Sequence, residues 1–279
     1  MTRPLLCRGT RAGTTSSCSA AAPPLVGGCS ATNAGFALRG WPADYDGWAT
    51  RGNPGWSFRE LLPLFRAVEA DRDVGGEWHG HTGPVPIRRP APDELSALQR
   101  AFLDAAAAGH ALVADHNAPG AVGVGPAPRN VCDRLRMSTA LTYLARARGR
   151  PNLRVRPDAL VDRVELAGST VHGVRLAGGE FVGADAVVLA AGSYGSPAIL
   201  LRSGVGPAAH LRHLGIPVAV DLPAVGGNLM DHPLVALDLP AFPDQQGPGF
   251  QVMLTLWSRR ARPDGPPDLH LFRRRTVRA

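Results

Sequence analysis

The sequence contains no lysine, no long apolar run and no close pair of cysteines, and each absence excludes a class of protein. All 30 basic residues other than histidine are arginine. No run reaches the roughly 20 apolar residues of a membrane-spanning helix, and the first 24 residues lack the apolar core of a secretory signal. The four cysteines, Cys7, Cys18, Cys29 and Cys132, form no C-x-x-C pair, so free thiols are expected rather than a zinc site or a disulfide framework. We expect a cytoplasmic protein with no integral membrane segment.

The net charge of +7 raises the question of a nucleic-acid partner, because basic surfaces neutralise phosphates. The arginines accompany high contents of Ala, Gly and Pro, a combination that is typical of coding bias. Four of them lie in the last seven residues: Arg273, Arg274, Arg275 and Arg278. No aromatic side chains interleave with the basic residues to form a stacking platform. No nucleic-acid partner is expected.

Helical spacing of apolar residues predicts three helices, one from Ser57 through Val68 and two more over about 93–108 and 138–148. The first of them opens with a capping box, because Glu60 follows Ser57 by three residues. Pro63 is expected to kink or split that helix, since proline lacks the backbone donor.

Residues 152–192 change to the short β-branched runs of an antiparallel meander, with turns at Gly168-Ser169 and Gly178-Gly179. The run from Ala186 to Ala191 is apolar at every position, which predicts a strand buried on both faces of a parallel sheet. Gly192 is expected to end this strand, with Ser196 capping a helix whose first residue is Pro197.

The strand, glycine turn and helix together indicate a nucleotide-binding unit, because a helix N-terminus favours phosphate groups. A hydrolase nucleophile elbow is excluded, since neither Ser193 nor Ser196 has the glycine that G-x-S-x-G requires two residues before it.

A second glycine-rich stretch, "LVGGCSATNAGF", begins at Leu25. The adjacent Gly27 and Gly28 indicate either a tight turn or a close approach of bare backbone to a ligand. From these residues alone both interpretations stay open.

Three segments resemble signatures of the glucose–methanol–choline (GMC) oxidoreductases, a family of FAD-dependent alcohol oxidases and dehydrogenases. They are "GSYGSPAILLRSGVG" from Gly192, "GGCSATNAGFALRGWPADYDGWATRGNPGW" from Gly27, and "VGGNLMDHP" from Val225. The resemblance covers about residues 25–272. It implies a mixed α/β fold: an incomplete FAD-binding Rossmann-like domain with a β-meander, followed by part of a substrate domain. The implied activity is hydride transfer from the CH–OH group of a small-molecule alcohol to FAD, as in choline dehydrogenases.

The resemblance also assigns cofactor-binding positions. In the family the glycine pair lets backbone approach the flavin and its pyrophosphate, and the following residues line the isoalloxazine ring. The positions that inherit these roles are Leu25, Gly27, Gly28, Ser30, Asn33, Ala34, Gly35 and Phe36. Gly192 belongs to the second signature, and Val161 matches the position that meets the adenine, although a plain core-strand role is equally consistent. Noncovalent FAD is expected, because Thr32 stands where a flavin-linking histidine would fall.

Two features of complete family members have no counterpart here. No G-x-G-x-x-G follows a strand, and Gly123 and Gly125 are interpreted as loop. The catalytic histidine of the family belongs to a C-terminal segment that the resemblance does not reach. His79 and His81 are expected to form a polar turn rather than a metal pair, and Asp231-His232 to be structural. The remaining histidines are expected at the surface: His110, His116, His172, His210, His213 and His270. No catalytic or metal-ligating residue is therefore assigned.

The expected organisation follows from these segments. Residues 25–80 and 146–232 are assigned to the FAD-binding domain, 81–145 to a helical substrate or cap segment, and 233–272 to the start of the substrate domain. Residues 1–24 and the arginine-rich tail 273–279 are expected to be disordered or non-native, as products of a frame change or misplaced start and stop. Two alternatives to an active oxidoreductase remain, an inactive fragment and one piece of a split enzyme that needs a complementary chain.

Overall fold

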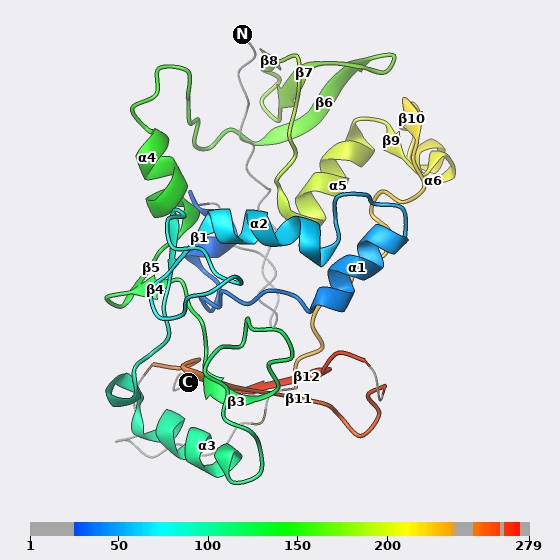
Figure 1. Ribbon diagram of the computed structural model, residues 1–279. Helices are drawn as coiled ribbons and strands as arrows, with labels where there is room; N and C mark the ends of the chain where they lie inside the picture. The colour runs from blue at the N-terminus through cyan, green and yellow to red at the C-terminus, as the bar shows by residue number, and fades with distance from the viewer. Residues whose placement is uncertain (1–24, 236, 238–247, 263–264, 274–279) are drawn as a thin grey trace. The chain divides into compact units, whose positions relative to one another are not determined.

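The computed structural model describes residues 25–235, 237, 248–262 and 265–273 (Figure 1). Of the segments expected to be disordered or non-native, 1–24 and 273–279, the structure describes only Arg273, whose carbonyl accepts hydrogen bonds from the Phe250 N–H and the Gln99 side chain. The rest of both segments lies outside the described residues. By its internal contacts the chain divides into two compact units, one of Met1–Gly28 with Ala145–Val235 and one of Cys29–Leu144 with Ala236–Ala279.

The first unit contains three helices and five strands among its described residues. They are α4 (Ala145–Ala147), β6 (Val161–Ala167), β7 (Thr170–Leu176), β8 (Phe181–Gly183), α5 (Gly192–Arg202), β9 (Val205–Gly206), α6 (Ala208–His213) and β10 (Val220–Asp221).

The described part of the second unit holds the other elements. They are α1 (Pro42–Thr50), α2 (Phe58–Val68), β1 (Glu69–Asp71), β2 (Val85–Ile87), η2 (Pro92–Glu94), α3 (Ala97–Ala107), β3 (Gly123–Pro126), β4 (Val131–Cys132), β5 (Leu135–Arg136), the π-helical η3 (Ala140–Leu144), β11 (Val252–Leu256) and β12 (Leu269–Phe272). A short 3-10 helix, η1 (Gly28–Ala31), lies at the point where the chain passes from the first unit to the second.

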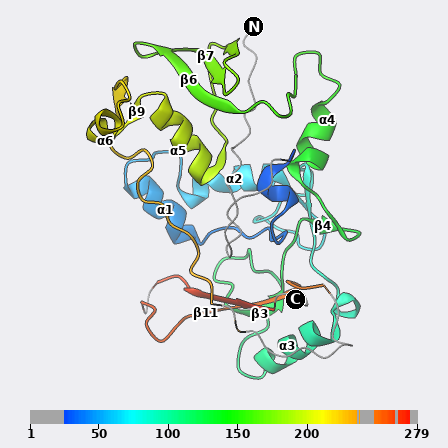
Figure 2. The same cartoon turned by 180° about the vertical axis from the view of Figure 1, so that it is seen from behind.

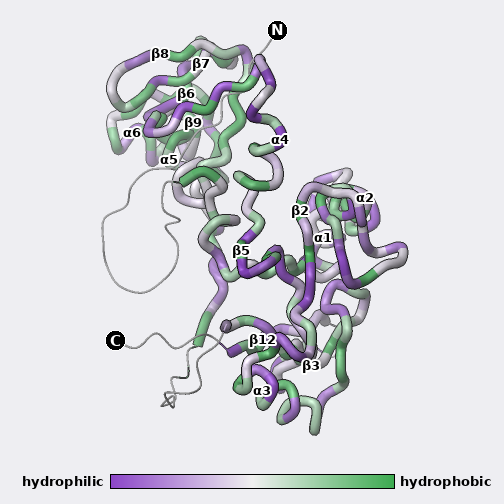
Figure 3. Tube along the Cα trace, turned by 90° about the vertical axis from the view of Figure 1, so that its left-hand side faces the viewer, coloured by the Kyte–Doolittle hydropathy of each residue, from purple (hydrophilic) through white to green (hydrophobic). Residues whose placement is uncertain are grey.

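The predicted meander is confirmed as the antiparallel sheet β6-β7-β8. Hydrophobic and hydrophilic residues are mixed along its strands (Figure 3), and one face packs on α5. The core between them contains Val161, Val164, Val174 and Ile199. Short β-branched runs and glycine turns were sufficient to predict this sheet, because each strand pairs with its sequence neighbour.

The strand predicted from Ala186 to Ala191 is wrong. No strand is assigned there, although Val187, Leu189 and Ala191 pack on the core of the meander. The intervening Val188 is 69% exposed. A strand needs backbone partners, and no described strand lies beside this segment to supply them.

Helix α5 begins at Gly192, so the prediction of Pro197 as its first residue is also wrong. Gly192 adopts φ +82°, which lets the chain turn directly into the helix. Pro197 is the sixth residue of α5, and the hydroxyl of Ser196 accepts a hydrogen bond from the Ala191 N–H at 3.0 Å.

The main sheet of the second unit has the order β12-β11-β3 and is antiparallel. Helix α3 packs against it (Figure 2) around Leu95, Val124, Val252 and Leu254. The interpretation of Gly123 and Gly125 as loop is therefore wrong, since both lie in β3.

These glycines are required for packing rather than for a turn. A Cβ on Gly123 would lie 2.1 Å from the Ala111 carbonyl oxygen, and one on Gly125 would lie 1.8 Å from that of Val113. Residues 111–113 run alongside β3, where the Val113 N–H donates to the Val124 carbonyl and the Val124 N–H donates to the Ala111 carbonyl, each at 2.9 Å. Only glycine permits this close approach.

The predicted helices are confirmed with changes at their boundaries. Helix α2 is capped by Ser57 and Glu60 as predicted, but it runs through Pro63 without being split. The helix expected over 93–108 is a 3-10 turn, η2, followed by α3 from Ala97. The third prediction corresponds to η3 and α4.

The smaller sheets are two-stranded: β1 and β2 are parallel, β9 and β10 are parallel, and β4 and β5 form an antiparallel hairpin.

Among the described residues, no helix has the length and apolar character needed to cross a membrane. Cys29 and Cys132, the two cysteines described, are free thiols as predicted.

Candidate flavin site

The glycine pair forms an open turn at the start of the described chain. Gly27 has φ +102° and Gly28 has φ +53°, and the Gly28 N–H donates to the Leu25 carbonyl at 3.1 Å. A Cβ added at Gly28 would meet no heavy atom within 4 Å, so one side of this turn is open space. The turn requires glycine for its backbone angles, and it leaves room for a ligand beside the backbone.

The residues after the turn, 29–37, are here named the loop segment. The Ser30 hydroxyl accepts a hydrogen bond from the Thr139 N–H at 3.0 Å, and its oxygen lies 3.2 Å from the Thr139 hydroxyl. The Asn33 side chain accepts a bond from the Gly35 N–H at 3.0 Å, which closes a turn. Gly35 is buried with φ +78°.

Residues 128–139 form the other side of this arrangement. The guanidinium groups of Arg129 and Arg136 donate to the carbonyls of Ala34 and Ala31, each at 2.9 Å. Two backbone bonds of 2.9 Å add to these, from the Asn130 N–H to the Gly35 carbonyl and from the Ala37 N–H to the Pro128 carbonyl. The shape of the loop segment is therefore set by residues about 100 positions further along the chain.

Phe36 ends the predicted flavin-facing stretch in an aromatic cluster. Its ring lies 5.5 Å from that of Phe250 and 5.6 Å from that of Phe272, centroid to centroid, in edge-on geometry. Sequence reasoning missed this contact, because the three rings come from segments that share no local pattern.

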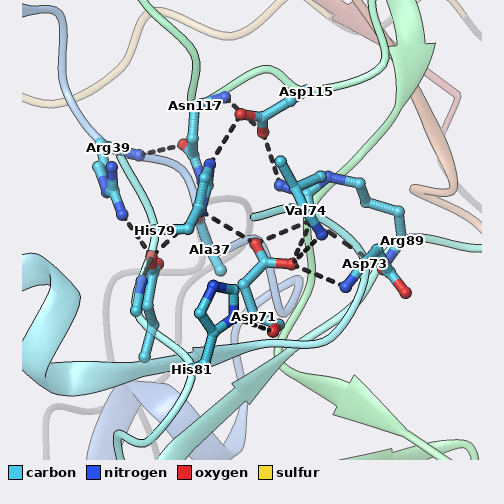
Figure 4. Close-up of polar contacts among 12 residues, drawn as sticks. Ala37, Arg39, Asp71, Asp73, Val74, His79, His81, Arg89, Asp115 and Asn117 are labelled. Atoms are coloured by element: carbon cyan, nitrogen blue, oxygen red, sulfur yellow. Dashed lines mark hydrogen bonds and ion pairs between the residues drawn. The ribbon is translucent and has the colours of Figure 1, made fainter. Parts of the chain in front are cut away.

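Figure 4 shows the polar network into which the chain continues after the loop segment. The Asn117 side chain bonds both the Arg39 N–H and the Ala37 carbonyl at 2.9 Å, and Arg39 forms an ion pair with Glu69 at 2.5 Å. Together these contacts hold residues 37–39 against the start of β1.

His79 lies at the centre of the same network and is only 2% exposed. Its Nδ1 is 3.1 Å from carboxylate oxygens of both Glu69 and Asp71, and its Nε2 is 2.9 Å from Asp115. Arg89 completes the network with contacts of 2.9 Å to Asp71 and 2.6 Å to Asp115. The expectation of a polar turn did not anticipate this burial, since the carboxylates come from distant segments.

The charges of the network compensate one another. Burial alone would raise the pKa of Asp115, but hydrogen bonds from the Asn117 N–H, His79 and Arg89 hold it below its usual value. No cluster suited to a metal ion occurs among the described residues. A cavity of about 440 Å³ lies beside the network and is lined by Pro63, Arg66, Ala67, His79, Gly80, His81 and Thr82.

His116 is buried, so its expected place at the surface is wrong. It is 8% exposed, and both ring nitrogens are buried without a hydrogen-bond partner among the described residues. Burial is the main cause that lowers the pKa of His116 to about 4. No local signal in the sequence could have predicted this, because the histidine packs beside Gly125 of β3.

The remaining candidate residues lie in the first unit. Val161 opens β6 and is 1% exposed in the core, and Gly192 opens α5. Their roles toward a flavin stay predictions. Asp231 and His232 are exposed, with 3.9 Å between the Asp231 carboxylate and His232 Nδ1.

An antiparallel meander, a helix that opens on a glycine turn and an open pair of left-handed glycines are features of a flavin-binding oxidoreductase domain. Comparison with known families makes this specific: the model of the GMC oxidoreductase family matches residues 6–234, and the chain belongs to this family. The resemblance inferred from the three segments is confirmed. Members of the family are oxidoreductases, and the family together with FAD-dependent structural neighbours implies flavin as cofactor.

Curated relatives agree with this assignment. An uncharacterised GMC-type oxidoreductase of Rhodococcus erythropolis is 39% identical over 246 residues, which is 85% of this chain and 49% of the relative. An oxygen-dependent choline dehydrogenase of Burkholderia ambifaria is 41% identical over 215 residues, 74% of this chain and 38% of the relative. The chain therefore spans about half the length, or less, of the relatives it matches.

Solved structures give the same result for the fold. Pyridoxine 4-oxidase from "Mesorbium loti" superposes with a TM-score of 0.67 at 39% identity, covering 71% of this chain and 40% of that one. An FAD-dependent oxidoreductase from Chaetomium thermophilum gives the same TM-score at 33% identity, covering 72% and 38%.

Proposed function

We propose that this chain contributes part of the flavin site of an FAD-dependent oxidoreductase that acts on the CH–OH group of a small alcohol, in the manner of a choline dehydrogenase. The observation that carries the proposal is the open turn at Gly27-Gly28, which leads directly into the anchored loop segment. The names of the relatives support an alcohol substrate, since they include choline dehydrogenases and a pyridoxine 4-oxidase.

The residues present fit a flavin. The vacant space at Gly28 admits a planar or anionic group against bare backbone, and backbone from Asn33 to Phe36 is fixed in one shape. FAD, when bound, supplies the hydride acceptor. The role of this chain is to bind and orient it: the glycine turn gives close approach, and the loop segment gives a rigid surface.

We propose that the FAD is held noncovalently. Thr32 occupies the position near which a flavin-linking histidine would fall, and a threonine hydroxyl does not form that bond. Assignment of residues 25–80 and 146–232 to the FAD domain, with 81–145 and 233–272 in the substrate part, remains a prediction.

The experiment that tests the proposal is a titration of the purified chain with FAD, followed by quenching of flavin fluorescence. Gly28→Ala adds a methyl group in the open space of the turn and is expected to weaken FAD binding at least tenfold. Gly168→Ala, in the β6–β7 turn, is a matched control, because Gly168 has φ +60° and equally empty surroundings. Both variants carry the same backbone strain, of about 1–2 kcal/mol.

Equal FAD affinity in the two variants would contradict this role for the glycine turn, and no quenching by the wild-type chain would contradict the proposed function. FAD that remains with the protein after denaturation and filtration would contradict noncovalent binding.

A second candidate is a split enzyme, in which a complementary chain carries the missing parts. The observation that favours it is the extended segment 186–190, which packs one side on the meander core and pairs with no described strand. An added strand from a partner polypeptide would complete its hydrogen bonding. Hydrogen exchange of these amides is expected to be fast in the isolated chain, and slow amides there would count against this candidate.

A further inference from the structure

Arg129 and Arg136 differ from three other buried or half-buried arginines of the second unit. Arg39, Arg88 and Arg89 each pair with a carboxylate at 2.5 to 2.9 Å. Arg129 and Arg136, like the half-buried Arg273, form no ion pair among the described residues. The guanidinium groups of Arg129 and Arg136 donate instead to the Ala34 and Ala31 carbonyls.

This arrangement is electrostatically costly. The Nε atoms of both arginines are buried without a hydrogen-bond partner among the described residues. Burial, and then the nearby charge of Arg136, lower the pKa of Arg129. A partly desolvated charge without a counter-ion reduces stability. Stability alone therefore does not explain two such arginines side by side.

Both arginines act on the same short stretch of backbone. The Ala31 carbonyl precedes the turn that Asn33 closes with Gly35, and the Ala34 carbonyl lies within it. Next to them, a Cβ on Gly35 would lie 2.9 Å from Val131 of the β4–β5 hairpin, so the loop segment lies tightly against this hairpin. Six hydrogen bonds join residues 30–37 to residues 128–139. Three of them go to carbonyls of the loop segment, and the two arginines supply two of these three, the third coming from the Asn130 N–H.

We infer that Arg129 and Arg136 are positioning residues for the flavin: they hold the carbonyls of the loop segment so that its backbone has the shape the flavin binds. The inference rests on the proposed function, because the loop segment is the stretch that would face the flavin ring. The two unpaired arginines reduce stability, and this cost is then explained by their role in shaping a binding surface.

The first test measures backbone hydrogen exchange in the absence of FAD. In Arg129→Gln and Arg136→Gln, amides of residues 29–37 are expected to exchange at least tenfold faster than in the wild type. Arg134→Gln is the matched control, because Arg134 is exposed in the turn of the same hairpin and its replacement removes the same charge.

Exchange in β11 reports on the second unit as a whole. Unchanged exchange in 29–37 would overturn the inference, and so would an equal acceleration in β11, which indicates a general loss of stability. Arg129→Lys and Arg136→Lys keep the charge and one donor, and are expected to restore part of the protection. If a glutamine variant does not fold, the exchange of residues 29–37 is measured in the corresponding lysine variant instead.

The second test is FAD titration of the same variants. The dissociation constant is expected to rise at least tenfold in Arg129→Gln and Arg136→Gln and to stay within twofold in Arg134→Gln. Wild-type affinity in both glutamine variants would overturn the inference while leaving the proposed function standing. A wild-type chain that binds no FAD would overturn both.

Discussion

At the scale of single residues, the second unit places titratable groups in two opposite environments. His79 has carboxylate oxygens within about 3 Å of both ring nitrogens, and arginines balance those carboxylates. His116, one residue after Asp115 of that network, has no side-chain hydrogen-bond partner that satisfies either nitrogen among the described residues. Such a buried histidine resists protonation, because the charged form loses its hydration and the nearby Gly125 backbone and Asp115 offset this only in part.

His116 is therefore expected to make the fold sensitive to acid. Its pKa is about 4 in the folded chain and 6.5 without the fold, so the unfolded chain takes up a proton first as the pH falls. The stabilisation is complete above pH 6.5 and is lost progressively down to pH 4, at a total cost of about 3 kcal/mol. Urea unfolding from pH 7.5 to 4 measures this.

The control is His116→Gln, which cannot titrate in this range. As the pH falls from 7.5 to 4, the unfolding free energy of the wild type is expected to decrease relative to that of the variant. A difference that stays constant from pH 7.5 to 4 would contradict the assignment.

At the scale of secondary structure elements, the close approach of residues 111–113 to β3 depends on two glycines. Gly125→Ala would place a methyl carbon 1.8 Å from the Val113 carbonyl oxygen, and backbone on both sides would have to separate. We expect a loss of more than about 3 kcal/mol in unfolding free energy, at the upper end of single-residue effects. Gly109→Ala, after the end of α3 in open surroundings, is expected to change it by less than 1 kcal/mol or so. Similar urea midpoints for the two variants would argue against this packing role.

The elements also show which parts of the fold could be predicted. The β6-β7-β8 sheet and the Ser57 cap of α2 depend on neighbours within about fifteen residues, and both were predicted correctly. β3 was missed because its glycines are explained only by residues 111–113. The run 186–191 was predicted as a strand because its composition suits one, but a strand also requires a partner that composition does not reveal.

The same distinction holds for the candidate site. From its own residues the glycine pair was interpreted as either a tight turn or a close approach to a ligand, and its positive φ angles fit both. Its role toward a flavin came from the family resemblance and stays a prediction. The anchors at Arg129, Asn130 and Arg136 could not be predicted, because about 100 residues separate them from the loop segment. Motifs identify which backbone approaches a cofactor, whereas the residues that hold this backbone become visible only through tertiary contacts.

At the scale of the whole molecule, the family match spans both compact units, and each unit has its own core. The chain nevertheless aligns with only 49% and 38% of two curated relatives. Flavin binding and alcohol oxidation therefore make different demands on it. On the proposed function, binding uses the backbone of the loop segment, whereas oxidation also needs a group that accepts the alcohol proton.

We accordingly predict that the chain of residues 1–279, supplied with FAD and a dye acceptor, oxidises no alcohol above the rate of free FAD. Two histidines that could accept a proton are buried in other contacts: His79 lies between Glu69 and Asp115, and His116 is 8% exposed. Loss of a general base typically lowers the rate by about 10²–10⁴-fold. The assay uses choline, glucose and a simple primary alcohol, with the Burkholderia ambifaria choline dehydrogenase as positive control on choline. Dye reduction by a chain whose mass confirms residues 1–279 would contradict the prediction, and would mean that a proton acceptor lies among the residues present.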